Sequence, residues 1–237
     1  MIRVVYSIVV VFALLASPLL GVAQTSKVYD ALQNANGAQG REFVLAFPTN
    51  DGSQFQGPAN LEIYVATSAR EAQVDLRFAG ETATKRFNVK NGEIVTLSTT
   101  ATGVLSLSAG YEILATESEQ TIPKGIIVTS SAPISIYVIN AKNVSSDGYL
   151  ALPTSVWGRK YLSTSYYDFA EQNNRFTWAG GFCVIAKDDD TDVTIRLRGQ
   201  GAGTARTRGN RQIGDVITIN MRRGEVYQVM GDGTTRN

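Results

Sequence analysis

An internal repeat with a long period constrains the fold of this 237-residue chain more than any other feature. The segment 40–47 (GREFVLAF) returns as 158–165 (GRKYLSTS), so the second copy starts 118 residues after the first. The alternating segment 74–78 returns as 193–197, 119 residues later. Solenoid repeats run to about 20–50 residues, so a period this long indicates a duplicated domain rather than a solenoid.

Two further matches complete the repeat. The apolar segment 61–66 corresponds to 182–186. Asn91-Gly92-Glu93-Ile94 corresponds to Arg223-Gly224-Glu225-Val226, and here the offset has grown to 132 residues. The additional residues of the second copy fit in one loop, around 199–214.

The spacing of the apolar residues indicates strands along most of the chain. Val74, Leu76 and Phe78 alternate with Asp75 and Arg77, which is the period of a strand with one buried face and one wet face. Two further strands are predicted around a short polar connection, at 125–130 and 133–139. Frequent glycine turns between such strands favour an all-β fold of two tandem, related, antiparallel β-sandwich domains.

These signals divide the chain into five segments: a signal peptide at 1–23, an N-terminal linker at 24–39, the first sandwich at 40–141, a connector at 142–157, and the second sandwich at 158–237. The first sandwich closes with the predicted strands 125–130 and 133–139. No equivalent of that closing pair follows segment 224–229 in this sequence. We therefore expect the second sandwich to be truncated at its C-terminus, with an exposed sheet edge.

The first 23 residues predict secretion. Arg3 precedes an apolar stretch that ends in the small residues Gly21-Val22-Ala23, and this pattern is typical of a cleaved signal peptide. An uncleaved membrane anchor is the alternative, because no charge occurs between Arg3 and Lys27. Cleavage after Ala23 would leave 21 basic and 21 acidic side chains and no further membrane span. Such a balance does not suit a general binder of nucleic acid or other polyanions.

The residue types present argue against an enzyme. The chain has no histidine, which excludes Ser-His-Asp and Cys-His catalysis and histidine-ligated metals. Its single cysteine, Cys183, lies in an apolar run and is expected to be a buried thiol; an intermolecular disulfide is the alternative. We expect no catalytic residue and no cofactor.

Two charged segments are candidate ligand sites. The acidic turn is expected to be a solvated hairpin tip, although its carboxylates are weak candidates for Ca²⁺ ligands: Asp188, Asp189, Asp190 and Asp192. The glycine-rich loop around 199–211 carries three arginines that could contact a sulfated glycan or another ligand: Arg206, Arg208 and Arg211. Ordinary solvating charge is the alternative for this loop, since no aromatic residues interleave it.

Aromatic residues gather after the connector, at Tyr161, Tyr166, Tyr167, Phe169, Phe176 and Trp178. Core packing explains such residues most simply, whereas an exposed patch would suit carbohydrate or protein recognition. Asn143 begins the sequon Asn143-Val144-Ser145, a possible N-glycosylation site in a secreted eukaryotic protein.

The segment after the first repeat carries a resemblance to a known family. Its core motif consists of Asp147, Gly148, Tyr149, Leu150, Ala151, Leu152 and Pro153, preceded by the strand-rich stretch 125–137. Together with segments 40–43, 47–48 and 224–229, this motif resembles the N-terminal domain of the IgGFc-binding protein family. The resemblance extends over nearly all of residues 40–237, and it implies a secreted or surface-exposed extracellular module.

A binding role follows from the resemblance and from the missing catalytic residues. We expect a secreted, non-enzymatic adhesion or binding module that recognises an extracellular protein or glycan through exposed loops on a rigid sheet. Two alternatives remain. One is a structural repeat unit of an extracellular or mucus-like matrix, and the other is a lectin or carbohydrate-active enzyme that uses the acidic turn and the aromatic residues.

Overall fold

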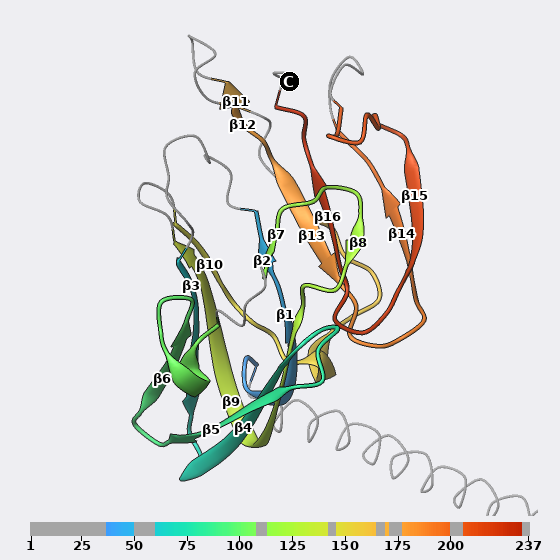
Figure 1. The fold of residues 1–237 in the computed structure, drawn as a ribbon. Coiled ribbons are helices and arrows are strands. Elements are labelled where there is room, and N and C mark those ends of the chain that lie inside the picture. The colour runs from blue at the N-terminus through green and yellow to red at the C-terminus, as the bar shows by residue number, and fades with distance from the viewer. Residues whose placement is uncertain are drawn as a thin grey trace, which may run out of the picture. The chain divides into compact units, whose positions relative to one another are not determined.

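The computed structural model describes residues 37–49, 60–107, 113–141, 146–164, 169–170, 177–199 and 206–233. The predicted signal peptide therefore lies outside the described residues. Within the described residues the fold is all-β, with antiparallel pairing between nearly all strands and no α-helix (Figure 1). Residues from Ala38 onward form one compact unit. No helix in the described part of the chain is long and apolar enough to cross a membrane.

One long strand, β9 (Ile126–Ala141), organises the first part of the chain. Its first half pairs with β4 (Glu71–Phe78) on one edge and with β1 (Gly40–Leu45) on the other. β5 (Thr84–Lys90) continues this layer beyond β4. Figure 1 shows β9 as the long curved strand that passes among these elements.

The second half of β9 belongs to another layer. It pairs with β3 (Asn60–Thr67) on one edge and with β10 (Ser146–Leu150) on the other. β6 (Ile94–Ser98) continues this layer beyond β3. We call these strands, in the order β6-β3-β9-β10, the outer layer.

The core forms between the two layers because alternate residues of each strand point inward. In β3 and β4 every second side chain is buried, as the period-2 pattern predicts. Leu61, Ile63 and Val65 of β3 join Val74 and others of β4 in one apolar cluster. Complete burial of aliphatic side chains of this size contributes about 1.5–3 kcal/mol each to stability.

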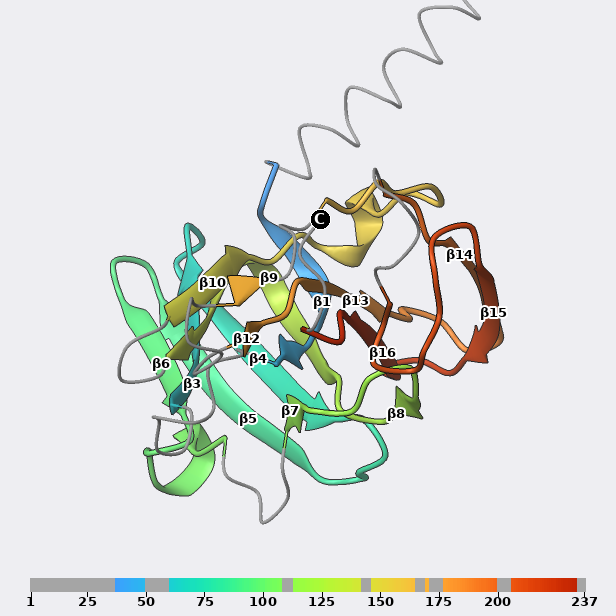
Figure 2. The same ribbon diagram turned by 90° about the horizontal axis from the view of Figure 1, so that it is seen from above.

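The later strands form two pairs. β13 (Gly181–Ile185) pairs with β16 (Val226–Met230), and β14 (Thr191–Arg196) pairs with β15 (Val216–Met221). Their apolar faces form a second cluster that includes Ala186, Ile195, Ile217, Met221, Tyr227 and Val229. Figure 2 shows the two pairs, in orange and red, as separate ribbons.

The remaining elements are short. β2 (Phe47–Pro48) pairs in parallel with β7 (Leu114–Ala115), and β8 (Thr121–Ile122) pairs with β16. β11 (Phe169–Ala170) pairs with β12 (Thr177–Trp178). Two single turns of 3-10 helix, η2 (Gly103–Leu105) and η3 (Thr154–Val156), lie in connections.

We call β1 to β10 the early strands and β11 to β16 the late strands. Contacts between them centre on Gln228 of β16, and the side chain of Gln228 is completely buried. Its side-chain oxygen accepts a hydrogen bond from Thr49 N at 2.8 Å, and its amide nitrogen donates to Ala115 O at 3.2 Å. Nearby, Gly125 N donates to Gly224 O at 2.9 Å, and a β-carbon on Gly125 would lie 2.3 Å from that oxygen. The early strands and the late strands are therefore in direct contact through β8, Gln228 and Gly125. The domain boundaries at residues 141 and 158 stay predictions.

The closing strands of the first sandwich differ from the prediction in one respect. The sequence predicts two strands, at 125–130 and 133–139, whereas the structure has one continuous strand with Pro133 inside it. Pro133 lies where β9 passes from its first pair of neighbours to its second. A missing backbone N–H is tolerated at such a change of partner, and the carbonyl of Pro133 accepts a hydrogen bond from Thr67 Oγ1 at 2.7 Å.

Replacing Ile136 by alanine tests the importance of β9 for stability. Ile136 is completely buried on the inward face of β9, so Ile136→Ala should lower the free energy of unfolding by about 2–5 kcal/mol. Urea denaturation followed by tryptophan fluorescence measures the change. Ile94→Ala, at an exposed position of β6, should alter stability by no more than about 0.5 kcal/mol. Equal losses in the two variants would contradict this account of the core.

Candidate functional site

An exposed apolar row crosses the outer layer. Tyr137 of β9 lies directly opposite Tyr64 of β3 on one side and Leu150 of β10 on the other. Tyr137 is 53% exposed, which is unusual for a large aromatic residue in the middle of a sheet. Ile94 of β6 is also exposed at the far edge of this layer. We call Tyr64, Tyr137 and Leu150 the tyrosine row.

Polar groups border the tyrosine row. The hydroxyl of Tyr64 donates a hydrogen bond to Glu62, which also accepts one from Asn60 Nδ2 at 2.8 Å. The bond to Glu62 raises the pKa of Tyr64, with smaller contributions from desolvation and from the charge of Glu62. Tyr64 is thus held as a neutral phenol, and the row presents apolar rings beside a carboxylate. Such a surface can contact a protein or a sugar through stacking and hydrogen bonds.

The segment 147–153 holds the outer layer to β1. The hydroxyl of Tyr149 donates to Ala46 O at 2.8 Å and accepts from Ala46 N at 3.2 Å. Ala151 N donates to Ile136 O at 2.9 Å. Pro153 is buried against Gly40, where an added β-carbon would lie 2.2 Å from the proline ring. Four of the seven motif residues, 147–150, lie in β10. The contacts of Tyr149, Ala151 and Pro153 are structural.

Desolvation raises the pKa of Tyr149 well above its ordinary value, although the hydrogen bond from Ala46 acts in the opposite direction. The phenol therefore stays protonated and keeps donating to Ala46. Tyr149, Asp147 and Gly148 line a small hollow together with Val138 and Asn140. Val138 and Asn140 are buried, so the hollow lies on the inward face of β9, opposite the tyrosine row.

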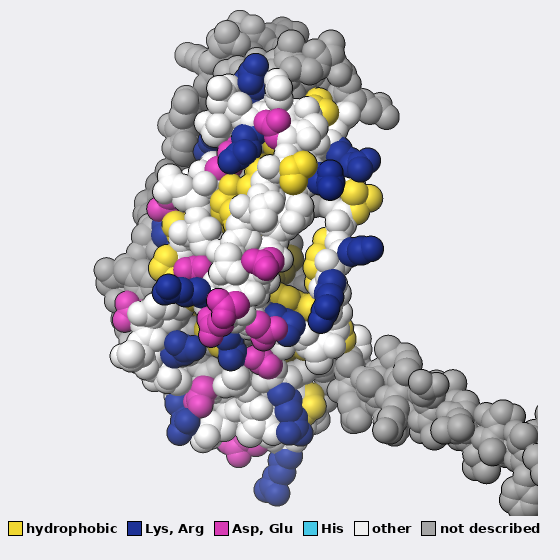
Figure 3. Space-filling model, turned by 90° about the vertical axis from the view of Figure 1, so that its right-hand side faces the viewer, with side chains coloured by type: hydrophobic (Ala, Val, Ile, Leu, Met, Phe, Trp, Pro, Cys, Tyr) yellow, Lys and Arg dark blue, Asp and Glu magenta, His cyan; other side chains and the backbone are white. Residues whose placement is uncertain are grey.

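The three candidate arginines make different local contacts. Arg211 Nε bonds Glu119 at 2.9 Å, and the same carboxylate accepts from Gly209 N at 3.1 Å. Arg206 bonds the backbone carbonyl of Asn210. Arg208 is exposed, and its backbone N–H bonds Met230 O. Figure 3 shows basic and acidic side chains together on the side of the molecule that faces the viewer.

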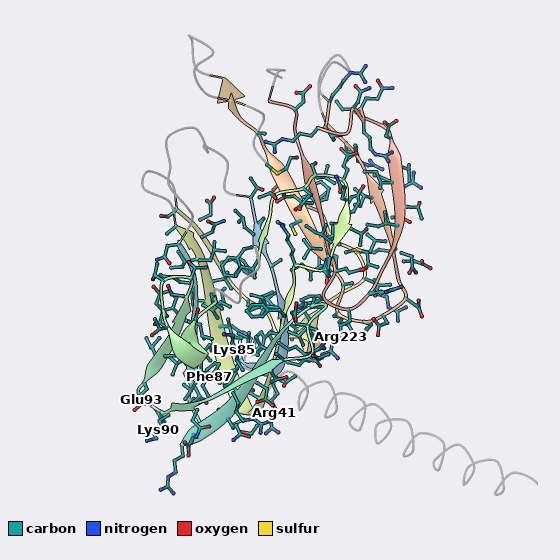
Figure 4. All side chains as sticks on the ribbon, in the orientation of Figure 1. Arg41, Lys85, Phe87, Lys90, Glu93 and Arg223 are labelled. Carbon is teal, nitrogen blue, oxygen red and sulfur yellow. The ribbon has the colours of Figure 1, made fainter. Side chains whose placement is uncertain are left out.

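The acidic turn makes local contacts. Asp189 accepts a hydrogen bond from Arg223 N at 3.0 Å, and Asp192 accepts one from Asn220 Nδ2 at 2.9 Å. Asp188 pairs with Lys187 at 2.5 Å, and Asp190 has a positive φ of 52°. No group of three potential ligands close enough to hold a metal ion occurs among the described residues. The side chain of Arg223, which is labelled in Figure 4, donates a hydrogen bond to Glu42 of β1.

Cys183 lies at the contact between the early and late strands. It packs beside Ala46, Ala115 and Val226, and it is not disulfide-bonded. Desolvation raises the pKa of its thiol to about 12, so the reactive thiolate is scarce at neutral pH. Cys183 is half-buried, so its packing agrees in part with the prediction of a buried thiol.

Several candidates from the sequence fall outside the description. Asn143, Tyr166, Tyr167 and Phe176 lie outside the described residues, and only the backbones of Phe169 and Trp178 are described. Tyr161 is described and strongly exposed. Sequence reasoning missed the tyrosine row, but a signal was present: Tyr137 has the opposite parity from Ile134, Ile136 and Val138 in an alternating strand.

Comparison with known families agrees with the resemblance noted in the sequence. A family model described as IgGFc binding protein matches residues 147–235. The match includes β10 and the late strands β11 to β16, and it begins at Asp147 of the motif. The resemblance is therefore confirmed for 147–235, whereas residues 40–146 lie outside the match. No curated protein and no solved structure matches the chain.

Removing one hydroxyl tests the anchor formed by Tyr149. Tyr149→Phe keeps the ring but leaves Ala46 without its side-chain partner, so the free energy of unfolding should fall by about 1 kcal/mol. Chemical denaturation measures this loss. Tyr161→Phe removes a hydroxyl from a strongly exposed side chain and serves as the matched control, with little expected change. A loss in the control as large as in Tyr149→Phe would contradict the assignment.

The raised pKa of Cys183 predicts a loss of stability at alkaline pH. Above about pH 8.5 the unfolded chain releases the thiol proton while the folded chain retains it, up to a pKa of about 12. Ionisation then favours the unfolded state, so this stabilising contribution is complete below pH 8.5 and is lost as the pH rises. Unfolding free energies measured from pH 8 to 11 should decline more steeply for the native chain than for Cys183→Ala. Parallel curves would show that Cys183 ionises normally in the folded protein.

Proposed function

We propose that this chain is a secreted extracellular recognition module that binds a protein ligand without catalysing a reaction. The tyrosine row carries the proposal, because it places exposed aromatic and aliphatic side chains on a hydrogen-bonded layer. Tyrosine supplies a large contact area at a low entropic cost and is enriched at the centres of protein interfaces. The signal-like residues 1–23 and the family match over 147–235 support an extracellular role.

We further propose that the chain contains two related strand sets. The first set is β3, β4, β5 and β6, and the second set is β13, β14, β15 and β16. In the first set β3 pairs with β6 and β4 with β5; in the second set β13 pairs with β16 and β14 with β15. Both sets therefore pair their first strand with their fourth and their second with their third.

The registers support this relation residue by residue. Ala66 pairs with Ile94 in the first set, and Ile185 pairs with Val226 in the second. Val74 pairs with Phe87, and Val193 pairs with Ile219. Each comparison gives an offset of 119 residues for the first partner and 132 for the second, which are the offsets of segments 74–78 and 91–94 in the sequence repeat.

A matrix role is a second candidate, because β10 is an exposed edge strand. All five residues of β10 are exposed, and among the described residues the strand pairs only with β9. Such an edge can add a strand from another molecule and so link copies of the chain. Concentration-dependent self-association in analytical ultracentrifugation that Ser146→Lys weakens would favour this role over ligand recognition.

Binding assays with a variant of Tyr137 test the recognition proposal. The family description names an immunoglobulin Fc region, so immobilised Fc fragment is the first probe, and a glycan array is the second. We expect saturable binding to a protein probe, and Tyr137→Ser should weaken it about tenfold or more, as for an interface hot spot. Surface plasmon resonance measures the change.

Val104→Ser is the matched control, because Val104 is similarly exposed but lies in η2, outside the tyrosine row. Its affinity for the probe should equal that of the native chain. Binding to glycans alone would favour a lectin, and equal binding by the native chain and Tyr137→Ser would rule out the tyrosine row as the contact surface.

A further inference from the structure

The outer layer contains acidic side chains but no basic ones. Strands β3, β6 and β10 and the second half of β9 (134–141) carry two carboxylates, Glu62 and Asp147, and no lysine or arginine. The layer across the core differs, because β4 and β5 carry four basic side chains, Arg77, Lys85, Arg86 and Lys90. The strands that hold the tyrosine row are therefore negatively charged in a chain whose net charge is +1.

Two hydrogen bonds orient the carboxylate of Glu62 beside the tyrosine row. Asn60 Nδ2 donates to Glu62 Oε1 at 2.8 Å, and the hydroxyl of Tyr64 donates to Glu62 Oε2. Each carboxylate oxygen has two lone pairs, so each oxygen can accept one further hydrogen bond. The carboxylate is thus fixed in position and can still receive a donor that presents two N–H groups.

The ring of Tyr137 lies diagonally across from Glu62. Tyr137 is opposite Tyr64 on β3, and Glu62 is opposite Ile139 on β9. Side chains on such a diagonal start about 7–8 Å apart, a separation that a long side chain can span. Tyr137 is 53% exposed, so more than half of its surface is open to a partner. An exposed aromatic ring beside a carboxylate attracts a cation through both groups.

Ile139 provides an apolar floor between these groups. It lies between Glu62 of β3 and Gly148 of β10. Ile139 is half-buried, and Gly148 has no side chain to cover it; a β-carbon on Gly148 would lie 3.4 Å from Ile139 Cγ1. The methylene stem of a long basic side chain can pack on such a floor. We call Glu62, Tyr64, Tyr137 and Ile139 the acidic seat.

We propose that the acidic seat receives an arginine side chain of the protein ligand. The guanidinium stacks on the ring of Tyr137 and donates two hydrogen bonds to Glu62, while its stem lies over Ile139. Arginine suits the seat better than lysine does, because its planar fork matches a carboxylate and stacks on aromatic rings. Arginine is also enriched among the residues that dominate binding at protein interfaces. This inference rests on the proposed function, since it names the chemistry of the partner of the tyrosine row.

A small arginine peptide tests the seat without the unidentified ligand. The probe is glycyl-arginyl-glycine blocked at both ends, titrated into the isotopically labelled full chain and followed by NMR. We expect saturable shifts of the ring signals of Tyr64 and Tyr137 and of the methyl signals of Ile139. The same peptide with citrulline in place of arginine keeps the shape but lacks the charge, and it should bind about tenfold more weakly.

Matched variants of the chain separate the charge from the ring. Glu62→Gln keeps an acceptor for Asn60 but removes the charge, and it should weaken binding of the arginine peptide about tenfold. Tyr137→Leu keeps an apolar side chain but removes the aromatic face, and it should weaken binding about threefold. Glu93→Gln removes the same charge from an exposed residue just before β6, labelled in Figure 4, and should leave the affinity unchanged.

Failure of this inference can be distinguished from failure of the proposed function. If Tyr137→Ser weakens binding of the Fc probe while Glu62→Gln has no effect on either probe, the tyrosine row recognises protein but takes no arginine. If the arginine peptide binds at Glu62 while Tyr137→Ser leaves the Fc affinity unchanged, the seat exists but the proposed recognition of that protein fails.

Three results would overturn the inference. The first is the absence of saturable shifts, or equal binding of the citrulline peptide. The second is a set of shifts centred on Glu93 or Asp147 in place of Glu62. The third is self-association of the chain in analytical ultracentrifugation that Glu62→Gln abolishes, because the arginine would then come from a second copy of this chain.

Discussion

Backbone hydrogen bonding by β9 is the interaction on which the first part of the structure depends. β9 occupies one edge each of β1, β3, β4 and β10, so four strands satisfy backbone donors and acceptors through it. The strand changes neighbours near Pro133, and this change carries the chain from one layer to the other. The core forms between those layers, and the tyrosine row lies on the outward face of the same strand.

Among the late strands, no described strand pairs with both β13 and β14 in the way that β9 pairs with both β3 and β4. Two antiparallel pairs still bury a small cluster, and Gln228 ties them to the early strands with hydrogen bonds that a buried amide requires. Yet no residue of β13 is fully buried, and segment 158–164 lies outside any strand and is solvent-exposed.

The family motif at 147–153 has a structural role in this chain. Tyr149 fixes the chain at Ala46, Ala151 bonds the backbone of β9, and Pro153 packs on Gly40. These contacts hold β10 beside β9 and thereby complete the tyrosine row with Leu150. The motif therefore positions a surface that can bind, while the exposed side chains of that surface come largely from strands outside the family match.

The sequence by itself determined the strand class and the inward residues, because period-2 alternation of residues such as Val74 and Leu76 reflects local geometry. It also indicated the repeat offsets and the apolar surroundings of Cys183. Only the tertiary structure decided that β9 is continuous, that Tyr137 meets Tyr64 and Leu150, and that Arg211 is bound to Glu119. Those features depend on which strand edges pair and in which register, and pairing between residues tens of positions apart leaves no trace in local periodicity.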